Sequence, residues 1–316
     1  MIKKNDKIFL AGHNGLVGSA VLRKLKDNNF KNVITAGRLK LNLFDQRKVE
    51  NFLKKHKPKI VILSAAKVGG IKANNKYRAD FIRENLQIQT NIIHGCHLSN
   101  INNLIFLGSS CVYPKNCKLP IKENYLLSGK LETTNEPYAI AKIAGIKMCE
   151  SYNKQYNRNY ISLMPTNTFG PGDNYNLENS HFIPAILRKL YLAKINKKKF
   201  INLWGTGKPK REIIYVDDLA NAIIYFINKK TNHSLINIGT SKEHSIKNIA
   251  NKIVKILNLK IKIKFDNNFK IDGTKSKVLD TSIAKNYGWK PNISFEKAIT
   301  ETYADLVKNY KKINGV

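Results

Sequence analysis

Three glycines spaced three residues apart near the N-terminus constrain the fold more than any other feature of the sequence. Gly12, Gly15 and Gly18 follow the apolar run 8–11 and open a segment with helical periodicity, 16–26. Glycine here lets the backbone approach a pyrophosphate closely, and the first helical turn points its amide groups at the same charge. The turn therefore predicts a dinucleotide site at Gly12, His13, Asn14, Gly15, Leu16, Val17 and Gly18.

Short apolar runs alternate with helical segments through the first half of the chain. This alternation is typical of a parallel sheet covered by helices on both faces. We therefore expect an α/β fold with a Rossmann-type doubly wound parallel sheet. The expected strands are 8–11, 32–36, 60–64, 104–108 and 160–165, and the expected helices are 16–26, 45–55, 81–98 and 138–156.

After Pro165 glycine and proline become more frequent and the elements become shorter. We expect residues 1–165 to form the dinucleotide-binding domain, with a return strand near 213–240, and residues 166–316 to form mainly a smaller C-terminal α/β substrate-binding lobe. Asp217 is expected to cap a helix that ends at 226. The other expected elements are strands 235–238 and 260–265 and helices 245–257 and 295–310.

Basic residues dominate the charge of the chain. Lys and Arg number 55 against 22 Asp and Glu, which gives a formal net charge of +33. They are spread along the sequence, and the longest run is 197–199, so we expect attraction of anionic small molecules and no nucleic-acid partner. No apolar stretch approaches the length of a membrane helix, and no secretion signal is recognised, so we expect a cytoplasmic protein without membrane association.

The four cysteines are Cys96, Cys111, Cys117 and Cys149. Their spacing matches neither a zinc site nor a disulfide framework. We therefore expect no metal and a reducing compartment.

Tyr138 and Lys142 lie four residues apart in a helix expected to begin after Pro137, so their side chains share one helix face. A nearby ammonium favours the phenolate, and we expect Lys142 to lower the pKa of Tyr138 so that the phenol exchanges a proton with a carbonyl or alcohol oxygen. Ser109 follows the expected strand 104–108, at the edge where open α/β sheets bind ligands. It can hydrogen-bond the same oxygen.

The residue that follows the second expected strand distinguishes between the two nicotinamide cofactors. An NAD site places an acid there for the ribose 2′-hydroxyl, whereas this sequence has Ala36, Gly37 and Arg38. A guanidinium suits a 2′-phosphate, so NADP(H) is the expected cofactor.

The glycine turn, the strand-end serine and the Tyr138–Lys142 pair together resemble the extended short-chain dehydrogenase/reductase superfamily. Longer motifs at 65–71, 108–111, 135–142 and 164–167, with shorter ones at 179–181, 204–205, 211–212 and 272–274, resemble the GDP-L-fucose synthase family from about Lys7 to Tyr310. This resemblance implies an NADPH-dependent enzyme that epimerises C3 and C5 of GDP-4-keto-6-deoxy-D-mannose and reduces C4 to give GDP-L-fucose. It also implies a homodimer, in which the helices expected at 81–98 and 138–156 could pair.

The resemblance further implies a role for each site residue. Ser109 and Tyr138 would stabilise the enolate, Cys111 and His181 would serve as the base and acid of the epimerisation, and Lys142 would hold the nicotinamide ribose. The substrate would be bound by Lys189, Trp204, Arg211, Asp272 and Lys277. Besides residues 12–18, Arg38 and Lys142, the cofactor would be contacted by Leu107, Gly108, Ser109, Ser110, Pro165, Thr166, Asn167, Thr168 and His181.

The sequence departs from the family's usual pattern at Asn14 and Lys189, where relatives commonly carry Arg. NADPH is still favoured, although Arg38 would then discriminate alone and Lys189 would offer a point charge in place of a planar fork.

One close alternative remains open on sequence grounds, and two others are disfavoured. A GDP-sugar epimerase-reductase acting on a 3-deoxy substrate, of the GDP-L-colitose type, would use the same catalytic set. A UDP-hexose 4-epimerase would have no need of Cys111 and His181 and usually keeps an acid after the second strand. A basic nucleic-acid-binding module would need base-reading or stacking motifs, which the sequence lacks.

Overall fold

The computed structural model describes residues 2–177, 180–266 and 274–313. A six-stranded parallel sheet forms its centre, with the strand order β2-β1-β3-β4-β5-β9. The strands are β1 Ile8–Ala11, β2 Val33–Thr35, β3 Ile60–Leu63, β4 Asn103–Leu107, β5 Asn159–Pro165 and β9 Leu235–Ile238. The predicted doubly wound α/β fold is confirmed.

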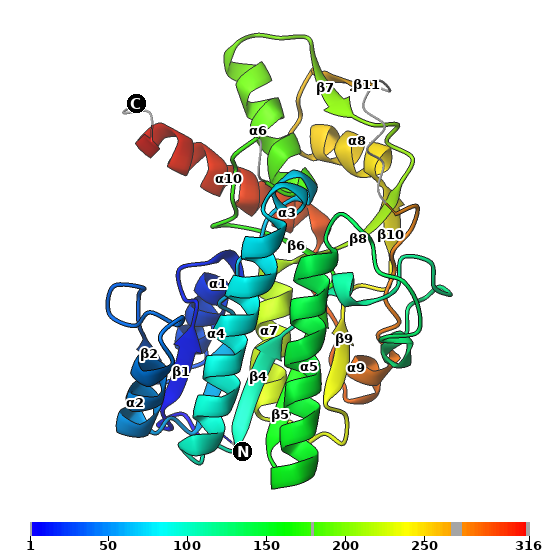
Figure 1. The fold of residues 1–316 in the computed structure, drawn as a ribbon. Coiled ribbons are helices and arrows are strands. Elements are labelled where there is room, and N and C mark those ends of the chain that lie inside the picture. The colour runs from blue at the N-terminus through cyan, green and yellow to red at the C-terminus, as the bar shows by residue number, and fades with distance from the viewer. Residues whose placement is uncertain (1, 178–179, 267–273, 314–316) are drawn as a thin grey trace.

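Helices cover both faces of this sheet (Figure 1). Helices α1 Leu16–Asp27 and α7 Val216–Ile227 pack together on one face, whereas α2 Gln46–His56, α4 Arg78–Leu98 and α5 Glu136–Tyr156 cover the other. Because successive side chains of a strand point to opposite faces, β1 supplies both cores. Ile8 and Leu10 are buried with α1, and Phe9 and Ala11 are buried with α2 and α4.

A smaller lobe lies beyond this sheet, at the top of Figure 1. It contains α6 Phe182–Ile195, α8 Ile246–Ile256 and α10 Phe295–Ile313, and β7 Phe200–Trp204 paired in parallel with β11 Lys262–Asp266. A three-stranded sheet connects the lobe to the larger layer, because β6 Asn167–Phe169 follows β5 directly and pairs with β8 Lys210–Tyr215, which pairs with β10 Glu243–Ser245. The short helices are α3 Ile71–Lys76, η1 Ser110–Val112, η2 Glu123–Tyr125 and α9 Ser282–Asn286.

Asp217 does not cap α7 as expected. The helix begins one residue earlier, at Val216, and the N-cap residue Tyr215 makes no side-chain capping bond. The Asp217 carboxylate instead accepts from Arg23 at 2.8 Å and lies 3.3 Å from the Lys24 ammonium. Both cations are on α1, so Asp217 ties α7 to α1 across the sheet face.

The sequence patterns did not predict α6. Glycine and proline become more frequent after Pro165, which favours shorter elements, yet Pro184 lies in the first turn of α6, where proline is tolerated because its missing N–H has no partner to lose.

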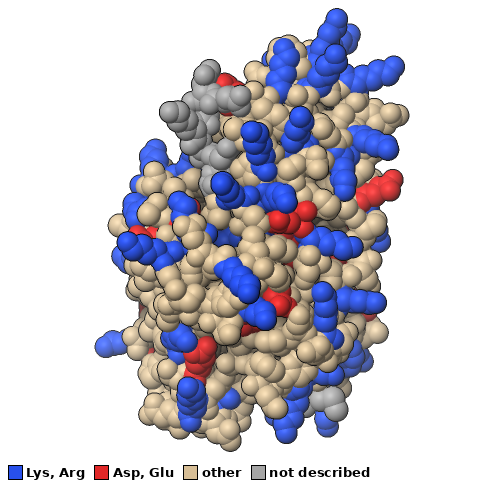
Figure 2. Space-filling view, turned by 90° about the vertical axis from the view of Figure 1, so that its right-hand side faces the viewer, with Lys and Arg blue, Asp and Glu red and all other residues tan. Residues whose placement is uncertain are grey.

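Basic side chains cover the face of the molecule in Figure 2, most densely over the smaller lobe at the top, with few acidic side chains between them. This distribution favours the approach of anionic ligands from solution. None of the helices in the described part of the chain is long and apolar enough to cross a membrane.

We expect Gly18→Ala to destabilise the protein. A Cβ at this position would lie 2.0 Å from the carbonyl oxygen of Gly12, which is backbone and must shift. Overpacking typically costs about 1–3 kcal/mol, which outweighs the gain of about 1 kcal/mol from replacing glycine within a helix. Urea unfolding measures the change.

Gly37→Ala is the matched control, because a Cβ there meets nothing within 4 Å. Equal unfolding midpoints for the two variants would contradict the packing argument.

Candidate active site

The predicted dinucleotide turn lies at the carboxyl end of β1. Gly12 adopts φ +92°, and a Cβ there would lie 2.5 Å from the backbone nitrogen of Ala65, so only glycine fits. Gly15 is the N-cap of α1 and provides no side-chain cap. The first-turn amides of α1 are therefore available to an anion, as the sequence predicts for a pyrophosphate.

Arg38 lies three residues beyond β2 and is exposed. Its guanidinium carbon lies 5.2 Å from the centre of the Phe44 ring. Stacking on this ring restricts the guanidinium at the carboxyl edge of the sheet, the position expected for a residue that holds a 2′-phosphate.

Lys142 is buried beneath the sheet edge. Its ammonium donates a 2.8 Å hydrogen bond to the carbonyl of Leu107, the last residue of β4, and lies 4.7 Å from the centre of the Phe106 ring. Burial lowers the pKa of Lys142 to about 7. The side chain is thus an internal link between α5 and β4, with its charge carried in a poorly hydrated setting.

Tyr138 lies one turn before Lys142 on α5, and its ring centre is 6.0 Å from the Lys142 ammonium. Burial raises the pKa of the phenol; Cys111 raises it further, and a hydrogen bond with Ser109 lowers it. The expectation that Lys142 makes the pKa of Tyr138 low is therefore wrong for this structure, because desolvation exceeds every favourable contact. Tyr138 is protonated at neutral pH and suited to donate its proton.

The structure brings Ser109, Cys111 and Tyr138 together, as the sequence predicts. Ser109 precedes η1, and its hydroxyl accepts from the Cys111 backbone N–H at 3.3 Å. The Cys111 sulfur accepts from the Asn135 side-chain amide at 3.2 Å. Sequence reasoning did not single out Asn135, because an Asn just before a helix is ordinarily a capping residue.

The strand ends on either side of this group are fixed by hydrogen bonds. The Gly108 backbone N–H donates to the carbonyl of Leu163 on β5 at 3.0 Å. The Thr166 hydroxyl and the Asn167 amide each donate to the Glu212 carbonyl at 2.9 Å. These bonds hold the start of β6 against β8 and set the position of the predicted cofactor contacts at Leu107, Ser110, Pro165 and Thr168.

His181 belongs to the other lobe, where it is the N-cap residue of α6 without a side-chain capping bond. The residue keeps solvent-exposed surface, yet the surrounding protein lowers the pKa of its imidazole. His181 makes no hydrogen bond to Ser109, Cys111 or Tyr138 in the described part of the chain.

The predicted substrate residues form two groups. The Lys189 ammonium donates to the Asn202 carbonyl at 2.8 Å and lies 5.1 Å from the ring centre of Trp204, which is 42% exposed. Lys72 of α3, which sequence reasoning missed, lies 3.8 Å from the same ring centre. Burial lowers the pKa of Lys189, and the charge of Lys72 lowers it further. An exposed ring beside two cations is suited to a planar anionic ligand.

The second group lies near β8. Arg211 donates to the carbonyls of Lys210 and Thr274 at 2.7 Å each. Lys277 lies close enough to Cys117 to lower the pKa of its thiol, although burial is the larger effect and raises it. Asp272 lies outside the described residues.

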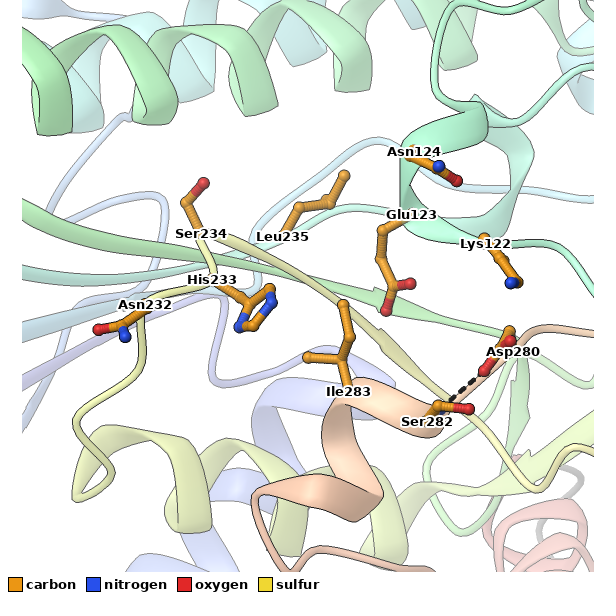
Figure 3. A pocket seen from close by; sticks show the side chains of 10 residues that line it. All are labelled: Lys122, Glu123, Asn124, Asn232, His233, Ser234, Leu235, Asp280, Ser282 and Ile283. Atoms are coloured by element: carbon orange, nitrogen blue, oxygen red, sulfur yellow. Dashed lines mark hydrogen bonds between the residues drawn. The ribbon is translucent and has the colours of Figure 1, made fainter.

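A hollow of about 620 Å³ lies elsewhere, at the outer edge of the sheet beside β9 (Figure 3). Its walls include Glu123, His233 and Asp280, and none of the predicted site residues lines it. The predicted catalytic residues Ser109, Cys111 and Tyr138 therefore lie outside this hollow, at the carboxyl ends of the central strands. In the part of the chain that the structure describes, no three His, Cys, Asp or Glu side chains are grouped as metal ligands.

Comparisons with known proteins agree with this geometry. Residues 8–239 match the model of the NAD dependent epimerase/dehydratase family. The chain is 47% identical to a putative GDP-L-fucose synthase 2 of Arabidopsis thaliana over 98% of this chain and 94% of that protein. It is 45% identical to the GDP-L-fucose synthase of Escherichia coli K12 over 98% and 99%, and 36% identical to the GDP-L-colitose synthase of Yersinia pseudotuberculosis over 94% and 96%.

Solved structures extend this likeness to three dimensions. A GDP-L-fucose synthetase of Naegleria fowleri bound to NADP superposes with a TM-score of 0.90 at 28% identity, covering 98% of this chain and 95% of that one. A GDP-6-OMe-4-keto-L-xylo-heptose reductase of C. jejuni superposes with a TM-score of 0.90 at 34% identity, covering 98% and 99%.

We expect iodoacetamide to alkylate Cys111 before the other cysteines of the native protein. Cys96 and Cys149 are fully buried and burial raises the pKa of both thiols, and burial also raises the pKa of Cys117. Because the thiolate is the reacting form, these three react slowly. Peptide mass spectrometry after brief labelling measures the order, with Cys117→Ser as control. Equal labelling of Cys111 and Cys149 would contradict the predicted order.

Proposed function

Since the chain belongs to the NAD dependent epimerase/dehydratase family, and within it to the GDP-L-fucose synthases, we propose that it converts GDP-4-keto-6-deoxy-D-mannose into GDP-L-fucose. The reaction is an epimerisation at C3 and C5 followed by an NADPH-dependent reduction at C4. The enzyme is an NADP-dependent oxidoreductase with additional epimerase activity.

One observation supports the catalytic assignment above all others. A protonated phenol, a hydroxyl and a sulfur, from Tyr138, Ser109 and Cys111, converge at the carboxyl edge of a parallel sheet. Besides the hydride, which NADPH would supply, reduction of a ketone requires of the protein only a proton donor and a second hydrogen-bond donor to the ketone oxygen. A sulfur beside them gives the site a group able to remove a carbon-bound proton, which reduction alone does not need.

The residues present fit NADP(H). The open N-terminus of α1 suits the pyrophosphate, and Arg38 on the Phe44 ring suits the 2′-phosphate. The residue at 14 is Asn in place of the Arg common among relatives, so Arg38 carries the 2′-phosphate selectivity. NADPH supplies the hydride that reduces C4 when it is bound. We assign cofactor binding mainly to residues 1–165, with α7 and β9 returning to the same layer.

The epimerisation uses the acidity of the carbons next to the C4 ketone. Hydrogen bonds from Ser109 and Tyr138 to the C4 oxygen stabilise the negative charge that develops when a proton leaves C3 or C5. The Cys111 thiolate removes the proton, forming an S–H bond as the C–H bond breaks. His181 returns a proton from the opposite face of the ring, which inverts the centre.

The reduction uses the protonated state of Tyr138. Because burial raises the pKa of the phenol, Tyr138 carries a proton at neutral pH and gives it to the C4 oxygen as the alcohol forms. Lys142 fixes the position of Tyr138 by anchoring α5 to β4 through the Leu107 carbonyl. It also holds the nicotinamide ribose.

Substrate binding uses the smaller lobe. Lys189, Trp204, Arg211, Asp272 and Lys277 hold the GDP portion, and Lys72 adds a second ammonium at the Trp204 ring. Two cations beside an exposed aromatic ring suit a nucleoside diphosphate, whose base stacks and whose phosphates attract Lys.

The assembly and location belong to the same proposal. Helices α4 and α5 pack side by side, and both carry exposed apolar side chains, including Leu98, Ile140 and Tyr156. This surface suits the pairing of two copies as a homodimer. Free cysteines suit a reducing cytoplasm.

Incubation with NADPH and GDP-4-keto-6-deoxy-D-mannose in heavy water tests the function. We expect deuterium at C3 and C5 of the product, because epimerisation exchanges both protons with solvent. Tyr138→Phe should slow hydride transfer by about 10²- to 10⁴-fold, since it removes the proton donor. Cys111→Ser should slow deuterium exchange more than reduction of an already epimerised ketone.

Cys117→Ser and Tyr156→Phe are matched controls and should keep both rates. Reduction without deuterium at C3 and C5 would contradict the epimerase activity, and the reverse ordering of the two active-site variants would reassign their roles.

Arg38→Ala should weaken NADPH binding by about 10- to 100-fold, because it removes charged hydrogen bonds to the 2′-phosphate. NADH binding should change little, since NADH lacks that phosphate. Cofactor titrations measure both affinities, with the exposed Lys31→Ala, at the other end of β2, as control. Equal losses for the two cofactors would remove this role from Arg38.

A further inference from the structure

Asn135 contacts the Cys111 sulfur in place of capping its own helix. It is the N-cap residue of α5, yet its side chain makes no capping bond. Its Nδ2 instead lies 3.2 Å from Cys111 Sγ, a residue 24 positions earlier in the chain. An Asn at this position ordinarily stabilises the start of a helix by a capping hydrogen bond. With its side chain on the Cys111 sulfur, Asn135 does not provide this stabilisation.

The other end of the same amide has no partner. Asn135 Oδ1 is buried and accepts no hydrogen bond in the described part of the chain. A buried acceptor left without a donor is unfavourable, so this arrangement is costly unless a ligand supplies the donor. The hydroxyl groups of a sugar ring are donors of this kind.

The direction of the amide fits an acceptor sulfur. A thiolate only accepts hydrogen bonds, and an amide N–H that donates to it favours the charged form. A 180° rotation of the amide would place Oδ1 against the sulfur and would suit only the protonated thiol. The titratable group that faces Cys111 from α5 is Tyr138, which burial keeps protonated and therefore uncharged at neutral pH.

We propose that Asn135 is a positioning residue for the epimerisation, whose amide N–H donates to the Cys111 sulfur as that sulfur acts as the base and whose amide oxygen accepts a hydroxyl of the bound sugar. This inference rests on the proposed function, in which the Cys111 thiolate removes the C3 or C5 proton. The electron pair of the broken C–H bond moves toward the C4 oxygen. The proton forms an S–H bond with Cys111, whose sulfur lies beside the Asn135 amide.

The pH dependence of Cys111 alkylation by iodoacetamide tests the thiolate role without substrate. In Asn135→Ala the midpoint should move upward by about one pH unit, with about tenfold slower labelling at neutral pH, because a hydrogen bond to a charged group is lost. Asn135→Asp should move it further, since a carboxylate would face the thiolate. Glu136→Gln is the matched control at the same helix end, because Glu136 pairs with Arg78 and not with Cys111.

Deuterium exchange supplies the second readout. Asn135→Ala should slow exchange at C3 and C5 by about tenfold or more beyond any loss in reduction of the epimerised ketone, because both reactions lose the sugar contact and only the exchange also loses the hydrogen bond to the sulfur. Asn135→Ser introduces a polar side chain that is too short to reach the sulfur, so it should behave like Asn135→Ala. It replaces the alanine variant in this experiment if that variant does not fold.

An unchanged alkylation midpoint in folded Asn135 variants, or equal losses of exchange and reduction, would overturn the inference. Failure of the wild type to exchange deuterium would instead count against the proposed function, and the alkylation midpoints would still decide the Asn135–Cys111 contact.

Discussion

The hydrogen bond from the buried Lys142 ammonium to the Leu107 carbonyl determines the arrangement of the active site. It fixes α5 against the carboxyl end of β4, where the main chain turns into Ser109 and Cys111. Tyr138 lies one turn earlier on α5 and reaches the same point. A proton donor and its neighbours are thus placed by one contact between a helix and a strand, made strong by its isolation from water.

Desolvation explains the electrostatics of this region better than pairwise charge does. Burial lowers the pKa of Lys142, raises that of Tyr138 and lowers that of His181. Each of these three shifts favours the neutral form of its group. The strongly basic surface acts outside this region and draws in the anionic part of the ligand.

Local sequence patterns predicted most of the larger layer. Its five leading strands and their helices follow from alternating apolar runs, and the glycine turn follows from the backbone freedom that Gly12 requires. The expectations for Asp217 and for the pKa of Tyr138 were wrong, because each depends on neighbours from other elements. Asp217 pairs with α1, and Tyr138 is desolvated by packing. Helix α6 was not predicted, because a proline such as Pro184 usually interrupts a helix.

The sequence by itself determined the kinds of chemistry available, since the glycine turn, Ser109, Tyr138, Lys142, Cys111 and His181 can be read without a structure. Only the tertiary structure decided their surroundings. It directed the Asn135 amide at Cys111, brought Lys72 to Trp204 and set the protonation state of Tyr138. The physical reason is that periodicity and motifs report local backbone preference, whereas burial and contacts between distant segments exist only once the chain has folded.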